Sequence, residues 1–168
     1  MNEKDLYDPI CFWLQNHTSN LINKKKIKSI ECFDVHNKYL NNFIQQNNLI
    51  ETLGKDSIGW KIKVDIFGYI QTKTLDTITY IAEVKDKQAS LIDLSQLIGY
   101  VSVCSANHAY LISSKGFSQD LLDLIQVMGR KDLLRIYSSK QMGKYTTIEM
   151  LYWDVNTDSP DNFKSIKI

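Results

Sequence analysis

The chain has 168 residues, a net charge of +1 and an apolar fraction of 43%. This length supports one hydrophobic core, so we expect a single domain over residues 1–168, and the apolar fraction excludes a largely disordered chain. The near-neutral charge argues against a protein that coats nucleic acid, although an enzyme can still carry a local basic rim.

The chain begins with a predicted helix over residues 4–17. Its apolar side chains recur at the spacing of one buried helix face: Leu6, Ile10, Trp13 and Leu14. Pro9 falls near the first turn, where its missing N–H is tolerated. Acidic residues at the start of this helix favour its dipole: Glu3, Asp5 and Asp8.

The section from residue 18 to about 58 gives the weakest signals. Residues 18–28 form a polar link that ends in a basic run, Lys24-Lys25-Lys26-Ile27-Lys28. We favour a solvated surface for this run over a phosphate contact. Residues 30–36 are consistent with a short strand, and residues 37–48 have helical spacing that is weakened by their asparagines.

Two predicted strands follow, over residues 60–70 and 77–85, joined by a polar turn at 71–76. The first alternates, with one face formed by Ile62, Val64, Ile66, Gly68 and Ile70. The second is rich in β-branched and aromatic residues. We expect the two to pair as an antiparallel hairpin.

Ser90 and Asp93 form a capping-box pattern that predicts the start of the next helix. One apolar stripe on it consists of Leu91, Leu94, Ile98 and Val101. A second row at helical spacing consists of Ile92, Gln96, Tyr100 and Val103. Two such rows predict a helix covered on more than one side.

The remaining elements alternate between strand and helix. Residues 108–113 predict a buried strand, Ser118 starts a helix that ends near Gly129, and two further strands follow at 133–138 and 147–155. The tail from Asn156 carries no clear signal. The order predicts an α/β fold, a mixed sheet flanked by helices.

No apolar run is long enough to span a membrane, and the acidic N-terminus lacks the features of a signal peptide. We therefore expect a cytoplasmic protein with no membrane partner. Cys11, Cys32 and Cys104 are far apart and form no CxxC pair, which argues against a zinc site or a disulfide framework.

Asp65, Glu83 and Lys85 are the candidates for chemistry. Asp65 interrupts an apolar strand, while Glu83 and Lys85 leave the same face of the next strand. The hairpin can bring the two carboxylates together as the hard oxygen site that Mg²⁺ prefers, with Lys85 acting on a water or a phosphate. The alternative from the same residues is structural: an ion pair of Asp65 with Lys63, and one of Glu83 with Lys85.

Three motifs in order, VDIFGYI, IAEVK and QLIGY, resemble those of the PD-(D/E)xK nuclease superfamily over about residues 60–113. Asp65 matches the first acid, Glu83 the second acid and Lys85 the lysine. Gln96 and Tyr100 match the Q-x-x-x-Y signature of its RecB-like nucleases. The first motif departs from the family because Val64 replaces the proline.

The resemblance implies a restriction-endonuclease-like fold with core order αβββαβ. It also implies a nuclease that uses Mg²⁺ or Mn²⁺ to hydrolyse DNA, with catalytic residues Asp65, Glu83, Lys85 and Gln96. Metal ligands would be Asp65, Glu83 and the backbone carbonyl of Val84. A further acid is expected in the first helix, with Glu3 preferred, and Tyr100 would support the helix or contact the backbone.

Three lysines are candidates for a phosphate-binding rim: Lys61, Lys63 and Lys87. The activity would serve DNA repair and recombination, or restriction and defence, and a homodimer would supply the two sites needed to cut a duplex. Two alternatives stay open. One is a non-catalytic DNA-binding or protein-interaction module on the same fold, and the other is an unrelated α/β interaction protein.

Overall fold

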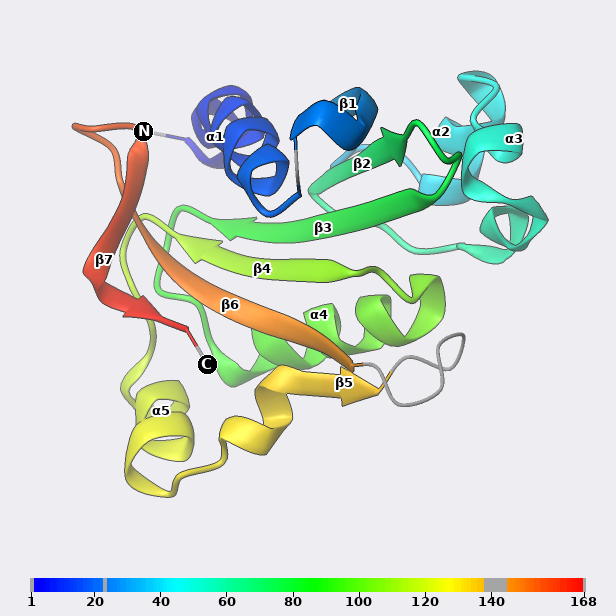
Figure 1. Ribbon diagram of the computed structural model, residues 1–168. Coiled ribbons are helices and arrows are strands. Elements are labelled where there is room, and N and C mark those ends of the chain that lie inside the picture. The colour runs from blue at the N-terminus through cyan, green and yellow to red at the C-terminus, as the bar shows by residue number, and fades with distance from the viewer. Residues whose placement is uncertain (1, 23, 138–144, 168) are drawn as a thin grey trace.

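The computed structural model describes residues 2–22, 24–137 and 145–167, and within them seven strands form one mixed sheet (Figure 1). The strands are β1 (Ile27–Asp34), β2 (Ile66–Thr72), β3 (Thr77–Lys85), β4 (His108–Ser113), β5 (Arg135–Tyr137), β6 (Tyr145–Asp154) and β7 (Ser159–Ile166). Their order is β1-β2-β3-β4-β6-β5, with β7 also paired to β6. The predicted α/β class with a mixed sheet flanked by helices is confirmed.

The sheet changes from antiparallel to parallel at β3. Strands β1, β2 and β3 form an antiparallel meander, whereas β3, β4 and β6 run parallel. A parallel neighbour requires a crossover, and α4 provides it between β3 and β4. Strands β5 and β7 both pair antiparallel to β6. The carboxyl end of β3 therefore lies beside the start of a crossover helix.

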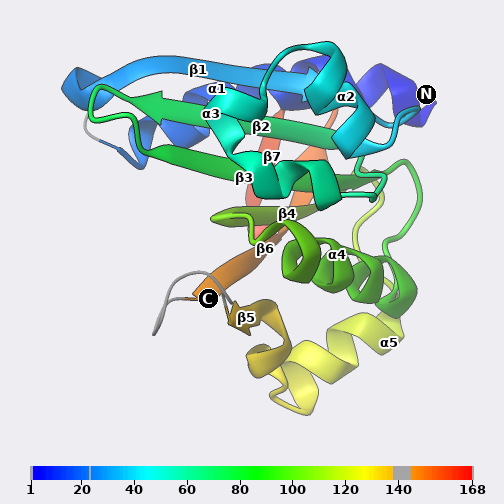
Figure 2. The same ribbon diagram turned by 90° about the vertical axis from the view of Figure 1, so that its right-hand side faces the viewer.

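Helices cover both faces of the sheet (Figure 2). The helices are α1 (Tyr7–Asn20), α2 (Leu40–Gln46), α3 (Ile50–Leu53), α4 (Leu91–Cys104) and α5 (Gln119–Leu122). A 3₁₀ turn, Glu3–Leu6, precedes α1. The core is split in two: α1 packs on one face, against residues such as Tyr80 and Val84, and α2, α4 and α5 pack on the other.

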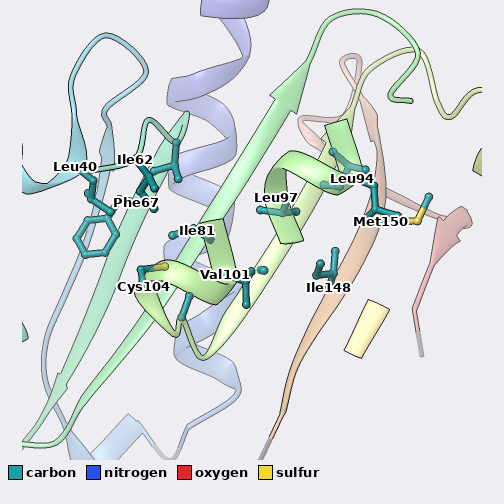
Figure 3. Close-up of a cluster of buried hydrophobic side chains, with 14 of the residues drawn as sticks. Leu40, Ile62, Phe67, Ile81, Leu94, Leu97, Val101, Cys104, Ile148 and Met150 are labelled. Carbon is teal, nitrogen blue, oxygen red and sulfur yellow. The ribbon is translucent and has the colours of Figure 1, made fainter. Parts of the chain in front are cut away.

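The α4 side of the core is built by one stripe of that helix (Figure 3). Leu97 and Val101 are fully or almost fully buried there, together with Ile81 of β3 and Ile148 of β6. Ser90 caps the helix by accepting a hydrogen bond from the Asp93 N–H, as predicted. The prediction that this helix is covered on more than one side is wrong. Ile92, from the second row, is 77% exposed, and only one face of α4 meets the sheet.

The predicted strand over residues 60–70 is correct only from Ile66 onward. Ile62 and Val64 pack in the α4-side core, whereas Ile66 packs on the α1 side, so the alternation breaks at Asp65. The cause is the neighbouring segment. The Val35 N–H donates to the Asp65 carbonyl and the Leu40 N–H donates to the Ile62 carbonyl, which holds residues 60–65 against the chain between the end of β1 and the start of α2.

Several helix and strand boundaries also differ from the predicted ones. The first helix reaches Asn20, beyond the predicted 4–17, and the strand predicted at 30–36 is β1. The tail after Asn156 forms β7, which we did not predict because most of its side chains are not buried and it has no apolar alternation. The strand predicted at 133–138 is correct only over β5, because residues 133–134 belong to a 3₁₀ turn, Lys131–Leu134, and residue 138 lies outside the described residues.

All three cysteines carry free thiols, in agreement with the expected absence of disulfides. In the described part of the chain, no helix has the length and apolar character needed to cross a bilayer.

Candidate active site

Asp65 lies at the junction where the extended segment enters β2, and two contacts orient its carboxylate. Oδ2 accepts a hydrogen bond of 2.8 Å from the Val84 N–H, and Oδ1 accepts one of 3.4 Å from the Tyr7 hydroxyl. The first contact ties the side chain to β3 across the hairpin. The alternative ion pair with Lys63 does not form, since Lys63 lies over the Tyr39 ring instead.

Glu83 and Lys85 leave the same face of β3, as their spacing predicted. Lys85 Nζ lies 2.7 Å from Glu83 Oε1 and 3.6 Å from Asp65 Oδ2. The three side chains are largely buried, with 12%, 3% and 14% of the surface exposed for Lys85, Glu83 and Asp65 respectively. One ammonium therefore faces two carboxylates at the carboxyl end of β3.

Helix α4 contributes Gln96 to this group. Gln96 Nε2 donates to Glu83 Oε1 at 3.2 Å and lies 2.7 Å from the Tyr100 hydroxyl. Gln96 therefore contacts the same carboxylate oxygen that Lys85 meets. Tyr100 reaches the site through Gln96, one helical turn away.

The start of α1 and the 3₁₀ turn before it add Tyr7 and Glu3 to the site. The Tyr7 hydroxyl lies 3.1 Å from Glu3 Oε1 and 3.4 Å from Asp65 Oδ1, so its single proton is shared between the two acids. Among the three N-terminal acids we considered, Glu3 is the one placed here, whereas Asp5 accepts a hydrogen bond from the Asn2 N–H. Tyr7 was missed, because nothing local in the sequence links it to a residue 58 positions away.

The electrostatics of the site follow from burial. Burial raises the pKa of Glu83 to about 7, and the Asp65 carboxylate adds to the effect. Burial also raises the pKa of Asp65. For Lys85, burial acts to lower the pKa, but the Glu83 and Asp65 carboxylates outweigh it and hold that pKa above its ordinary value. Lys85 is thus firmly protonated at neutral pH.

The residues present fit a divalent cation. Glu83 Oε2 is buried and has no hydrogen-bond partner among the described residues, and when Asp65 and Glu83 are both ionised their charge exceeds that of the one ammonium. A residue's N–H and C=O leave a strand on the same side, so the Val84 carbonyl also faces the Asp65 side. Mg²⁺ commonly binds through one or two carboxylates and keeps several waters.

Glu3 does not complete a compact three-carboxylate site. Within the described residues, no group of three or more His, Cys, Asp or Glu side chains is close enough to hold a metal ion. A cation here would therefore depend on Asp65 and Glu83, with the Val84 carbonyl and water.

The predicted basic rim is exposed, as a phosphate contact requires, but it is spread out. Lys61 and Lys63 precede Asp65 on the extended segment, and Lys87 follows Lys85 by two residues.

Comparison of the chain with protein-family models, with curated proteins and with solved structures finds no match.

Proposed function

We propose that this protein is a metal-dependent deoxyribonuclease of the PD-(D/E)xK type. The observation that carries the proposal is the convergence of Asp65 and Glu83 on Lys85, with Gln96 from α4 bonded to Glu83. The order α1, β1, β2, β3, α4, β4 also agrees with the αβββαβ core of a restriction-endonuclease-like fold, although α2 and α3 are inserted between β1 and β2.

The roles of the residues follow from their charges. Asp65 and Glu83 would hold Mg²⁺ or Mn²⁺, which lowers the pKa of water and polarises a phosphate when bound. Lys85, kept protonated by the two carboxylates, would donate from Nζ to the scissile phosphate and stabilise its developing negative charge. Gln96 would hold the Glu83 carboxylate in place, and Tyr7 would do the same for Asp65.

The test is a cleavage assay on supercoiled plasmid, linear duplex, single strands and a four-way junction, each with Mg²⁺, Mn²⁺ or EDTA. Wild type is compared with Glu83→Gln, and Glu51→Gln on the exposed surface of α3 serves as the matched control. We expect metal-dependent cutting by wild type and the control only. The preferred substrate would then separate a repair or recombination role from a restriction or defence role.

One observation favours a second candidate, a non-catalytic DNA-binding or interaction module. The Lys85 ammonium already pairs with both carboxylates, so the cluster can be stable as an ion pair alone. Calorimetry with Mn²⁺ separates the two functions. No cutting of any substrate and no Mn²⁺ binding would reject the nuclease and leave the module.

A further inference from the structure

A hollow lies on the surface between the start of α2 and the segment that leads to Asp65. Its volume is about 420 Å³, and it is lined by Tyr39, Asn41, Asn42 and Lys61. Sites for small organic groups fall in the range of roughly 300–1,000 Å³. The hollow is therefore large enough for one planar heterocycle.

Backbone hydrogen bonds hold the two walls of this hollow together. The Leu40 N–H donates to the Ile62 carbonyl at 2.8 Å, and the Asn41 N–H donates to the Trp60 carbonyl at 3.1 Å. Tyr39 is the N-cap residue of α2, but its side chain makes no capping hydrogen bond. Tyr39 is 49% exposed, so its side chain is accessible to a ligand in the hollow.

The lining combines an aromatic ring, amides and positive charge. Lys63 Nζ lies 4.9 Å from the centroid of the Tyr39 ring. In the part of the chain that the structure describes, neither Lys61 nor Lys63 forms an ion pair. Asn41 is only 8% exposed, and its Oδ1 has no hydrogen-bond partner among the described residues.

These groups are the ones that recognise an unstacked nucleotide. An exposed aromatic face stacks on a base, side-chain amides bond its edge, and lysines neutralise the adjoining phosphates. An apolar ligand would need none of the lysines, and a bare anion would need no aromatic ring.

The hollow is also close to the candidate active site along the chain. Lys61 precedes Asp65 by four residues, and a fully extended segment of that length spans at most about 14 Å. One strand of stacked DNA advances about 3.4 Å per nucleotide. The hollow and Asp65 can therefore contact the same strand within about four nucleotides of each other.

We propose that this hollow binds an unstacked base of the DNA strand near the site of cleavage, with Tyr39 stacking on the base. Lys61 and Lys63 contact the phosphates on either side of it, and the exposed Asn42 amide contacts its edge. The proposal rests on the proposed nuclease function. It makes single-stranded or locally unpaired DNA the preferred substrate.

Binding measured in EDTA tests the proposal without cleavage. The probes are a fluorescently labelled single strand of mixed sequence, the same strand with abasic sites, and a blunt duplex, all followed by fluorescence anisotropy. The variants are Tyr39→Ala and Tyr39→Phe. Tyr137→Ala removes an exposed tyrosine from β5, at the opposite edge of the sheet, and serves as the control.

We expect Tyr39→Ala to bind the normal single strand roughly 5-fold or more weakly than wild type. Its affinity for the abasic strand should be unchanged, and Tyr39→Phe should bind like wild type. Equal affinity of Tyr39→Ala and wild type for the normal strand would overturn the proposal, as would equal weakening for both strands. Tyr39→Gln provides a second variant for the same comparison if Tyr39→Ala does not fold.

Two further results distinguish the sources of a failure. If thymidine monophosphate displaces the strand at equal concentration, the hollow is a site for free nucleotides and the proposal is overturned. Base-dependent binding without any metal-dependent cutting would reject only the nuclease. If Glu83→Gln loses cutting but Tyr39→Ala binds the strand as wild type does, the nuclease function stands and only the base-binding role of the hollow is rejected.

Discussion

Gln96 and Glu83 are joined by a hydrogen bond of 3.2 Å that links helix α4 to strand β3 across the candidate active site. The same amide nitrogen lies 2.7 Å from the Tyr100 hydroxyl, so the amide is held from both sides. The bond orients a buried carboxylate whose other side-chain partner among the described residues is Lys85. A carboxylate held in this way is prepared to bind a cation.

Removing this amide should weaken metal binding without unfolding the protein. Groups that orient a metal ligand typically contribute 10–100-fold to metal affinity or activity. We expect Gln96→Ala to lose about that factor in cleavage rate and in Mn²⁺ affinity by calorimetry. Gln126→Ala, at an exposed glutamine outside the candidate active site, is the control. Unchanged Mn²⁺ affinity in Gln96→Ala would show that Gln96 has no positioning role.

Lys85→Met removes the ammonium and keeps the aliphatic stem, which leaves two buried carboxylates facing each other. Breaking a buried ion pair from one side costs about 3–5 kcal/mol when the remaining charge stays ionised. We expect lost cleavage, and a loss of unfolding free energy that is larger at pH 8 than at pH 5, because protonation relieves the repulsion. Urea denaturation at both pH values measures it. Lys87→Met should retain stability, and equal losses at both pH values would contradict this explanation.

Glu83 should make the metal-free protein less stable as the pH rises. Burial raises its pKa to about 7, whereas an unfolded glutamate titrates near about 4.3. Between these values the folded state binds more protons than the unfolded state, so stability falls with increasing pH. In EDTA, wild type should lose about 2 kcal/mol more than Glu83→Gln between pH 5 and pH 8. Parallel pH profiles of the two proteins would disprove the raised pKa.

Gly68 and Gly99 form a matched pair for stability. A Cβ at Gly68 would clash with the ring of the buried Tyr80, whereas one at Gly99, in α4, would meet nothing within 4 Å. We expect Gly68→Ala to cost at least about 1–3 kcal/mol through overpacking. Gly99→Ala should add up to about 1 kcal/mol, because alanine is the better helix former. Thermal unfolding measures both, and a neutral Gly68→Ala would mean that Tyr80 can move.

The local features of this protein could be predicted because they depend on neighbouring residues. The β-branched and aromatic run at 77–85 gave the bounds of β3, and the Ser90–Asp93 capping box gave the start of α4. Glu83 and Lys85 share a face because strand side chains alternate with a period of two.

Tertiary contacts decided the rest. The Tyr7 contact to Asp65, the bond between Gln96 and Glu83, and the pairing of β7 with β6 all depend on how distant segments pack. The break in alternation at Asp65 has the same origin, because the start of α2 forms backbone hydrogen bonds with residues 60–62, just before Asp65. Residue types and local periodicity thus determined which side chains can do chemistry. Packing alone determined their partners and burial, because these depend on chain segments that no local pattern brings together.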